Sequence, residues 1–256
     1  IPEKNYLYSV PFEWYEKYGV RRYGAHGISH RYVARQAASL MNKPLKELKL
    51  ITCHLGAGSS LCAVKDGKSF DTTMGFTPLT GVTMATRSGD VDVELVTYMM
   101  KKLNITDPEE MISILTRHSG LLGISGISSD MRDVIAAKDA GNKRAQIAVT
   151  LFVKNIVRYI GQYYAEMKGL DGIVFTAGIG ENSDVIRKLV CDELEFMGVK
   201  LDDTLNSKGE EGFITKPDSK IAALLVPTDE ELMISRDIEV IKLQEQKEIS
   251  SKKPLL

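Results

Sequence analysis

Two short apolar runs late in the chain constrain its fold more than any other feature. Gly172–Thr176 (GIVFT) and Ile221–Val226 (IAALLV) show no alternation of polar and apolar residues. Strands that are covered on both faces have this pattern, whereas strands with one solvated face alternate. The two runs therefore predict strands in the middle of a sheet.

Three further strands are expected earlier in the chain, at Lys49–Leu55, Leu61–Lys65 and Lys68–Thr73. The first turn between them is glycine-rich, and the second contains Asp66-Gly67, which is a strong hairpin signal. This part of the sequence predicts an antiparallel meander.

Helices are predicted around these strands. Lys143–Lys168 repeats apolar residues every three or four positions with charges on the other face, which is typical of a long amphipathic helix. Other helices are expected at His30–Met41, Val91–Leu103, Pro108–Arg117, Asp184–Phe196 and Asp229–Leu243. The order of elements predicts an α/β fold with a mixed sheet, a three-strand meander and flanking helices. We expect one domain over residues 1–243 and a frayed, polar tail over residues 244–256.

Composition favours a protein that acts on small molecules. Lys+Arg (33) nearly balance Asp+Glu (34), so no broad basic field is expected to hold nucleic acid or an anionic membrane. No apolar segment approaches the roughly 18 residues of a membrane span. Cys53, Cys62 and Cys191 form no C-x-x-C pair, which indicates reduced core thiols and a cytoplasmic location. The start at Ile1-Pro2 suggests that an upstream segment has been removed.

Two glycine-rich turns are candidate phosphate contacts. In His54–Ser60 (HLGAGSS) the missing side chains let backbone N–H groups approach a phosphate, and Ser59 and Ser60 add hydroxyl donors. Thr176–Ser183 (TAGIGENS) joins a buried strand to a helix, where open α/β sheets bind ligands, with Asn182 or Ser183 as helix cap. Ordinary hairpins and strand-to-helix turns also need glycine, so neither turn alone establishes a nucleotide site.

Candidate donors lie in two loops. Arg87, within TMATRSGD, could present its planar guanidinium to phosphoryl oxygens, and the alternative is a solvated arginine near Asp90. His26 is interpreted as a loop donor to an oxyanion. For His30, at the start of a helix, we favour simple buried hydrogen bonds. Gly27 argues against a metal-binding pair on one helix.

The segment PTDEEL (227–232) contains a candidate metal ligand. Thr228 and Glu231 have the spacing of a capping box, which would occupy Glu231 at the third helical position. Glu230 would then be free to bind a cation. Magnesium favours one or two carboxylates together with water and phosphate oxygens.

Together these motifs resemble the acetate kinase family, from near Tyr6 to about Ile241. The matching stretches are YEKYGVRRYGAHGISHRYV, ITCHLGAGSSL, GFTPLTG, ATRSGDVD, SGLLGISG, SSDMRD, VFTAGIGENS and PTDEEL. Butyrate and propionate kinases share parts of this series, so the acyl chain stays open. The order of elements is also similar to one ribonuclease-H-like unit of the superfamily of acetate and sugar kinases, Hsc70 and actin. Its members carry two units with the nucleotide between them, and this chain contains one, the C-terminal unit.

The resemblance implies reversible, Mg²⁺-dependent phosphoryl transfer between ATP and acetate, giving acetyl phosphate and ADP, in a homodimer. His26 and Arg87 would stabilise the transferring group, and Glu230 would help to hold Mg²⁺, with Glu231 in reserve. In-line transfer depends on positioning and charge stabilisation, so no Ser–His–Asp triad is expected. The implied nucleotide contacts are His54, Leu55, Gly56, Ala57 and Gly58 at the phosphates, Asp130, Met131 and Arg132 at the nucleoside, and Gly178, Ile179, Gly180, Glu181 and Asn182 at the adenosine.

The chain departs from the family pattern at four positions. Ala57 replaces an asparagine, Ala85 a glycine, Val93 a proline and Ile28 a threonine. The family also has an N-terminal domain with an asparagine that assists the metal, an arginine that meets the carboxylate and an aspartate in a D-T-A-F-H stretch, which would fall upstream of Ile1. We therefore expect these 256 residues to fold without turning over.

Two alternatives remain at this stage. The first is a non-catalytic module that binds nucleotide or dimerises, as the four substitutions would allow. The second is a zinc hydrolase built on His26, His30 and His54.

Overall fold

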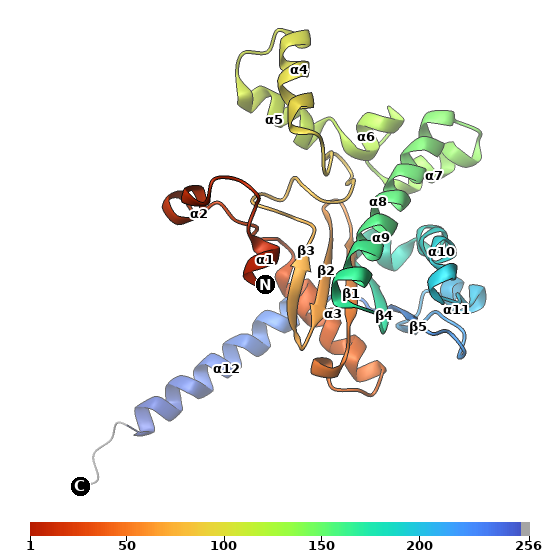
Figure 1. Ribbon diagram of the computed structural model, residues 1–256. Coiled ribbons are helices and arrows are strands. Elements are labelled where there is room, and N and C mark those ends of the chain that lie inside the picture. Colours follow the sequence, from red (N-terminus) through yellow and green to blue (C-terminus); the bar gives the residue numbers. More distant parts are fainter. Residues whose placement is uncertain (252–256) are drawn as a thin grey trace.

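A six-stranded mixed sheet forms the centre of the molecule, with helices on both faces (Figure 1). The computed structural model describes residues 1–251, except for the side chains of residues 236, 240 and 245–251. The strand order is β3-β2-β1-β4-β6-β5. The bounds are Leu50–Leu55 for β1, Ser59–Lys65 for β2, Lys68–Thr72 for β3, Gly172–Thr176 for β4, Gly212–Phe213 for β5 and Ala222–Leu225 for β6.

The pairing confirms the fold class predicted from the sequence. Strands β1, β2 and β3 form the expected antiparallel meander. Strands β1, β4 and β6 run parallel to one another, and the short β5 pairs antiparallel with β6. Because β4 and β6 lie inside the sheet, their unbroken apolar runs are buried from both sides.

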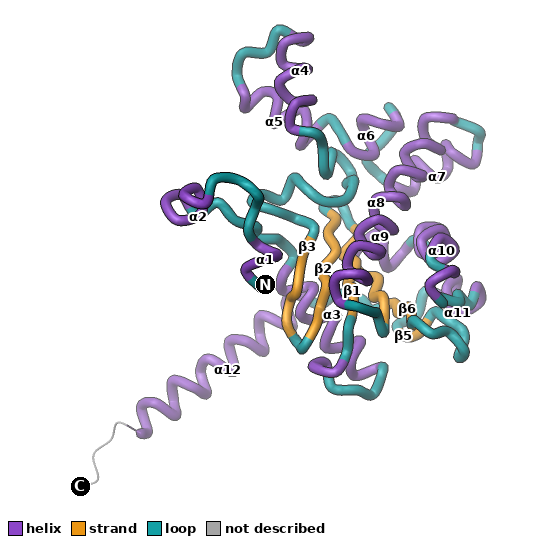
Figure 2. The backbone as a smooth tube through the Cα atoms, in the orientation of Figure 1, coloured by secondary structure: helices purple, strands orange, loops and turns teal. Residues whose placement is uncertain are grey.

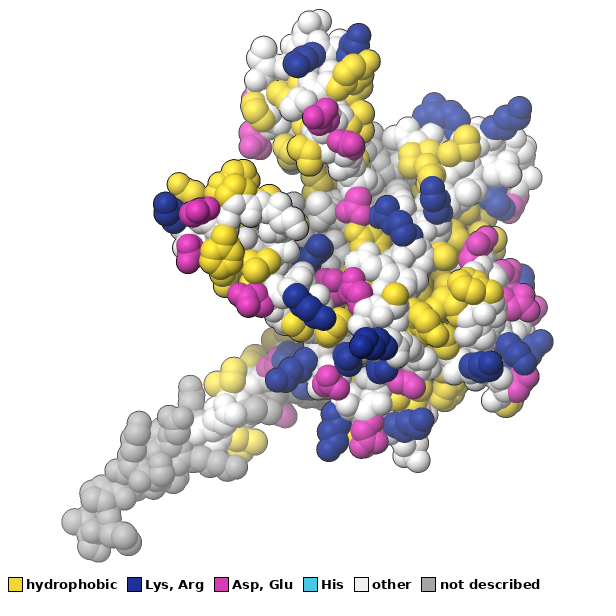
Figure 3. All heavy atoms as spheres, in the orientation of Figure 1, with side chains coloured by type: hydrophobic (Ala, Val, Ile, Leu, Met, Phe, Trp, Pro, Cys, Tyr) yellow, Lys and Arg dark blue, Asp and Glu magenta, His cyan; other side chains and the backbone are white. Residues whose placement is uncertain are grey.

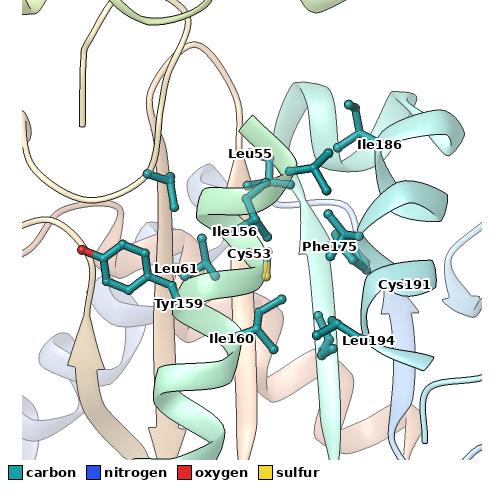
Figure 4. Close-up of a cluster of buried hydrophobic side chains, with 14 of the residues drawn as sticks. Cys53, Leu55, Leu61, Ile156, Tyr159, Ile160, Phe175, Ile186, Cys191 and Leu194 are labelled. Carbon is teal, nitrogen blue, oxygen red and sulfur yellow. The ribbon is translucent and has the colours of Figure 1, made fainter. Parts of the chain in front are cut away.

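Alternate residues of β1 serve two separate cores. Ile51, Cys53 and Leu55 pack with α8 (Lys143–Met167), whose Ile156 and Ile160 lie beside them (Figure 4). Leu50 belongs to a second core on the opposite face, under α3 (Gly27–Leu40). Successive side chains of a strand point to opposite faces, so Thr52 and His54 share the α3 face with Leu50. These two polar residues prepare the site described below.

The remaining helices lie around these layers (Figures 1 and 2). On the α8 side, α6, α7 and α10 contact α8, whereas α12 contacts α3 on the other side. Helices α4 and α5 form a hairpin that stands away from the sheet (Figure 1). The bounds are Glu3–Tyr6 for α1, Phe12–Tyr18 for α2, Val93–Leu103 for α4, Pro108–Arg117 for α5, Gly120–Ser125 for α6, Met131–Asp139 for α7, Ala177–Asn182 for α9, Asp184–Glu193 for α10, Asp203–Lys208 for α11 and Glu230–Ser251 for α12, with single 3₁₀ turns at Leu45–Glu47 and Glu195–Met197.

Three local predictions need correction. Ser59 and Ser60 belong to β2 and not to the preceding turn. Residues 177–182, expected as a loop, form the short helix α9. Helix α12 extends beyond its expected end at Leu243, to Ser251, and residues 252–256 lie outside the described residues.

The surface agrees with the balanced charge of the sequence. On the face drawn in Figure 3, basic and acidic side chains are interspersed. Among residues 1–251, no helix combines the length and the apolar character that a membrane crossing requires. The thiols of Cys53, Cys62 and Cys191 are free and buried, as expected for core cysteines.

Candidate functional site

The candidate site lies where the parallel strands β1, β4 and β6 end. Their carboxyl ends meet at one edge of the sheet, which is where open α/β sheets bind ligands. The glycine-rich turn of residues 56–58 leaves β1 at this edge, α9 begins directly after β4, and the loop to α12 follows β6.

His26 and Arg87 converge on Gly58 in this turn. A Cβ atom added to Gly58 would lie 3.4 Å from Arg87 Nη1 and 3.4 Å from both Cε1 and Nε2 of His26. The two side chains come from loops far apart in sequence, so the turn brings them together. Arg87 is half-buried and donates from Nη1 to the carbonyl of Pro78 at 3.2 Å.

The alternative interpretation of Arg87 as a solvated partner of Asp90 is wrong. Asp90 accepts hydrogen bonds from Arg158 and from the Tyr159 hydroxyl, both at 2.6 Å, and from the backbone N–H of Gly81 at 2.8 Å. Asp90 therefore anchors the loop to α8, and Arg87 is left at the glycine-rich turn.

Three histidine rings form a compact cluster beneath this turn. The rings of His26 and His54 stack with centroids 4.0 Å apart, and the ring of His30 lies edge-on to both. His26 directly precedes α3 in a left-handed conformation with φ at 58°, and its Nδ1 is bonded to Ser60 Oγ on β2 at 2.8 Å. His30 is buried and forms hydrogen bonds to Thr52 and Ser60, as the sequence interpretation favoured.

Burial keeps this cluster uncharged at neutral pH. The pKa of His54 falls to about 4, because burial disfavours the charged ring and His26 lies next to it. Burial and, to a smaller extent, Arg87 lower the pKa of His26. Burial followed by the two neighbouring rings holds the pKa of His30 well below its ordinary value.

The arrangement of these rings does not suit a zinc site. Both ring nitrogens of His30 are engaged by hydroxyl groups, and Nδ1 of His54 is bonded to Ser29 Oγ at 2.9 Å. Among the side chains that the structure describes, no group of three or more histidine, cysteine, aspartate or glutamate residues is placed to hold a metal ion. The hydrolase alternative therefore has no geometric support.

A cavity of about 850 Å³ opens beside the glycine-rich turn. Its walls come from all three segments that the sequence predicts for nucleotide: Gly56 and Ala57, the start of α7 at residues 130–132, and α9 with Gly178, Ile179 and Asn182. The volume is in the range of small-molecule sites. A Cβ atom added to Gly178 would meet no neighbouring atom within 4 Å, and Gly178 lines the cavity. The backbone at Gly178 is therefore open to the cavity.

The predicted nucleoside residues have distinct positions at the cavity wall. Asp130 caps α7 by accepting from the backbone N–H of Arg132 at 2.9 Å, and it also pairs with the Arg132 guanidinium at 2.6 Å. This pair lowers the pKa of Asp130 to about 2. Met131 is buried in the core under α8 while it contributes to the wall.

Glu181 has an inward position that the sequence interpretation did not foresee. Its Oε1 accepts from the backbone N–H of Ala177 at 2.8 Å, from that of Thr228 at 3.0 Å and from the Thr176 hydroxyl at 3.3 Å. The bond to Ala177 secures a residue with φ at 64°, a conformation that is strained for alanine. The carboxylate thereby joins α9 to the loop that precedes α12.

Three other predicted contacts, His54, Leu55 and Gly180, are buried. His54 and Leu55 belong to β1, and Gly180 packs against Phe175 and Cys53, where a Cβ would already be in contact with the backbone. These residues shape the turn from below, whereas Gly56, Ala57, Gly178, Ile179 and Asn182 form the cavity surface.

Arg187 supports α9 from beneath and was missed by the sequence analysis. Its side chain is buried and donates to the carbonyls of Gly180 (2.9 Å), Glu181 (2.7 Å) and Asn206 (2.7 Å) and to the amide oxygen of Asn206 (2.7 Å). The two α9 carbonyls belong to the last turn of a helix, where intrahelical partners are lacking. A single arginine in a surface-like helix pattern gave no signal of this role.

The start of α12 differs from the predicted capping box. Asp229 accepts from the backbone N–H of Leu232 at 2.8 Å, so Asp229 caps the helix. The Thr228 hydroxyl instead donates to Ser29 Oγ at 2.9 Å. Glu230 and Glu231 are thus the first and second helical residues, and Glu230 is the more buried of the two.

The residues present could hold a magnesium ion only if a bound phosphate supplied further ligands. Glu230 supplies one half-buried carboxylate, and the described side chains include no larger acidic group with metal-binding geometry. A cation at Glu230 would take its other ligands from water and phosphate oxygens, which is the usual habit of Mg²⁺.

Comparison with known proteins identifies the family. The model of the acetokinase family matches residues 1–236. The chain belongs to this family. It is 57% identical over 245 residues to the acetate kinase of Limosilactobacillus fermentum, covering 95% of this chain and 61% of that relative. It is 54% identical over 239 residues to the acetate kinase of Bacillus subtilis, covering 93% and 60%.

Solved structures of acetokinase family members agree. The acetate kinase of Porphyromonas gingivalis superposes with a TM-score of 0.91 at 42% identity, covering 94% of this chain and 61% of that one. A propionate kinase from Francisella tularensis superposes with a TM-score of 0.86 at 39% identity, covering 91% and 59%. The chain thus spans about three fifths of the length of these family members.

The four positions at which the resemblance implies a departure from the family pattern differ in their relation to the site. Ala57 and Ala85 both line the cavity, and the N–H of Ala85 donates to the carbonyl of Ala57 at 3.2 Å. Ile28 packs against the core under α3. Val93 is the first residue of α4 and is 79% exposed, a position where proline and valine are both tolerated.

Arg187→Met should destabilise the chain by about 2–5 kcal/mol, because several buried carbonyl oxygens would lose their donor. Urea unfolding monitored by circular dichroism measures this loss. Lys188→Met, at the exposed neighbouring position, is the control and should change stability little. Equal effects of the two variants would contradict the role of Arg187.

Stability should depend on pH through the histidine cluster. The folded-state pKa of His54, about 4, lies below the ordinary value of about 6.5, so the unfolded chain binds more protons between these values. The free energy of unfolding should therefore fall as the pH drops from about 6.5 to about 4.

His54→Asn should make this fall shallower. Unfolding by urea at several pH values tests the expectation, with His118→Asn at an exposed histidine as the matched control. If both variants kept the slope of the parent chain, His54 would not be the source of the acid sensitivity.

Proposed function

We propose that this chain forms the side of an acetate kinase that binds the nucleotide and stabilises the phosphoryl group, in reversible Mg²⁺-dependent transfer between ATP and acetate. The convergence of His26 and Arg87 on Gly58, beside a cavity built from the three predicted nucleotide segments, carries the proposal. Membership of the acetokinase family and the acetate kinases among its relatives support the reaction.

The geometry suits a transfer that needs no nucleophilic side chain. A γ-phosphate beside Gly58 would have the cationic fork of Arg87 on one side and the His26 ring on the other. Charge spread over the equatorial oxygens of the transferring group would be stabilised by Arg87 in this half-buried place more strongly than in water. Mg²⁺ held by Glu230 would neutralise charge on the nucleotide phosphates.

The adenosine would lie in the cavity between α7 and α9. Gly178 and Ile179 offer an apolar wall with close backbone approach, and the Asp130–Arg132 pair edges the opposite side. We favour acetate over propionate as acceptor because the curated relatives at 53–58% identity are acetate kinases. The proposal includes a homodimer and a cytoplasmic location, to which three buried, free thiols are suited.

A chain of these 256 residues should bind ADP without forming acetyl phosphate. The nucleotide cavity is built from residues that are present, whereas the metal-assisting asparagine and the carboxylate-binding arginine implied by the resemblance are not among them. Calorimetric titration with Mg-ADP measures the first property, and a hydroxamate assay with ATP, acetate and Mg²⁺ measures the second.

The two assays separate the remaining possibilities. Binding without turnover agrees with the proposal, whereas turnover would show that the carboxylate side is complete within this chain. Absence of nucleotide binding would overturn the assignment of the cavity. Arg87→Gln should weaken binding of Mg-ATP, whose γ-phosphate Arg87 would face, and Lys188→Gln, at an exposed position on α10, should leave it unchanged.

Ala57 supports a second candidate function, a nucleotide-binding module with weakened catalysis. Its methyl group lies exposed at the cavity wall. The family resemblance implies an asparagine, and hence an amide donor, at this position. A hydrogen bond to a charged group contributes about 1.5–3 kcal/mol.

Ala57→Asn should therefore tighten Mg-ADP binding by roughly 10-fold or more. Calorimetric titration of the variant measures the change. Val93→Pro, which restores the family residue at an exposed site far from the cavity wall, is the control and should leave the affinity unchanged. Equal affinities of parent and Ala57→Asn would show that the lost amide has no contact with the nucleotide.

A further inference from the structure

A continuous chain of hydrogen bonds runs from His26 into the protein. Nδ1 of His26 is bonded to Ser60 Oγ at 2.8 Å, and the same oxygen is bonded to His30 Nε2 at 2.8 Å. His30 Nδ1 is bonded to Thr52 Oγ1 at 2.7 Å. The Thr52 hydroxyl donates to the carbonyl of Cys62 at 3.4 Å.

The fold leaves little room for other partners along this chain. Ser60 and Thr52 are fully buried, and His30 is 3% exposed. Thr52 of β1 pairs with Cys62 of β2, and His54 of β1 pairs with Ser60, so the strand register fixes the positions of both hydroxyls. His30 comes from the first turns of α3, which covers this face of the sheet.

The last acceptor sets the direction of every proton in the chain. A backbone carbonyl only accepts, so the single proton of the Thr52 hydroxyl is donated to the carbonyl oxygen of Cys62. The distance between these two oxygens is long for such a bond. Thr52 Oγ1 must then accept from His30 Nδ1–H. A neutral His30 has its lone pair on Nε2, to which Ser60 donates, and Ser60 Oγ must accept from His26 Nδ1–H.

We propose that Ser60, His30 and Thr52 are positioning residues that hold the proton of neutral His26 on Nδ1, so that Nε2 faces the glycine-rich turn as a lone pair. Nε2 is the ring nitrogen that would lie 3.4 Å from a Cβ on Gly58. In the neutral state this nitrogen accepts a hydrogen bond and donates none.

His26 then has a specific task in phosphoryl transfer, and this task rests on the proposed function. A lone pair repels a phosphoryl oxygen, so His26 can stabilise the transferring group only after Nε2 has taken up a proton. Arg87 and the rings of His54 and His30 face His26 from the neighbouring loop, from β1 and from α3. They and burial oppose that charge until an anionic ligand is present.

A second chain gives His54 the opposite tautomer and provides an internal contrast. The Thr228 hydroxyl donates to Ser29 Oγ, and Ser29 is bonded to His54 Nδ1 at 2.9 Å. Ser29 is fully buried, and His54 Nδ1 is the one acceptor that the described residues offer to its hydroxyl once Thr228 donates to it. Ser29 therefore donates to Nδ1, and the proton of neutral His54 lies on Nε2.

Two-bond ¹H–¹⁵N correlation spectra of the ¹⁵N-labelled chain without ligand, at about pH 8 where free histidine is neutral, identify each tautomer directly. The chain has four histidines, which single His→Asn variants assign, and the exposed His118 reports the mixture found in water. We expect His26 as the Nδ1–H tautomer and His54 as the Nε2–H tautomer. An Nε2–H or averaged signal for His26 would overturn the proposal.

Variants test whether the buried hydrogen bonds from Ser60 to Thr52 determine the tautomer of His26. Ser60→Ala and Thr52→Val should release His26 toward the water-like mixture, whereas Thr52→Ser, which keeps the hydroxyl, should retain Nδ1–H. Ser29→Ala should alter only His54. If Ser60→Ala and Thr52→Val both left the His26 signals unchanged, the proposed relay would be refuted. These readouts need neither nucleotide nor turnover, so they stand whether or not the ADP titration supports the proposed function.

Discussion

The burial of β1 on both faces is the constraint on which the rest of the molecule depends. Cys53 and Leu55 need an apolar layer on one side, and Leu50 needs one on the other, so α8 and α3 must pack on opposite faces. The carboxyl end of β1 is then fixed in the middle of the sheet. The turn of residues 56–58 inherits this position, with α9 on one side and β2 on the other.

Covering β1 completely creates a second requirement, because Thr52 and His54 are polar. Buried polar groups are costly unless they are hydrogen-bonded. Helix α3 meets this requirement with Ser29, bonded to His54, and with His30, bonded to Thr52. Strand β2 contributes the carbonyl of Cys62, which accepts from Thr52. The histidine cluster is thus part of the core packing, and its uncharged state follows from that location. The same packing fixes the rings beside the turn before any ligand arrives.

Predictions from the sequence succeeded where the determining pattern was local. The bounds of β4 and α5 were predicted correctly, because an unbroken apolar run and an Asp-Pro helix start are readable within a few residues. The capping box failed because Thr228 and Asp229 are adjacent and only the fold shows that Thr228 is engaged by Ser29. Helix α9 was missed because its support comes from Arg187 and Glu181, whose roles depend on partners in other elements. His26 and Arg87 were proposed as candidate donors from their loop motifs, and the family resemblance implied their role at the transferring group, whereas their meeting at Gly58 required the structure.

The shared acceptor at Glu181 has a mechanical consequence. One carboxylate oxygen receives N–H groups from Ala177, at the start of α9, and from Thr228, two residues before Glu230. Both backbone segments are therefore hydrogen-bonded to the same atom, which couples the position of one to that of the other. The cavity wall proposed for adenosine and the carboxylate proposed for the metal would keep a constant spacing, so any closing motion would move them together as one rigid unit.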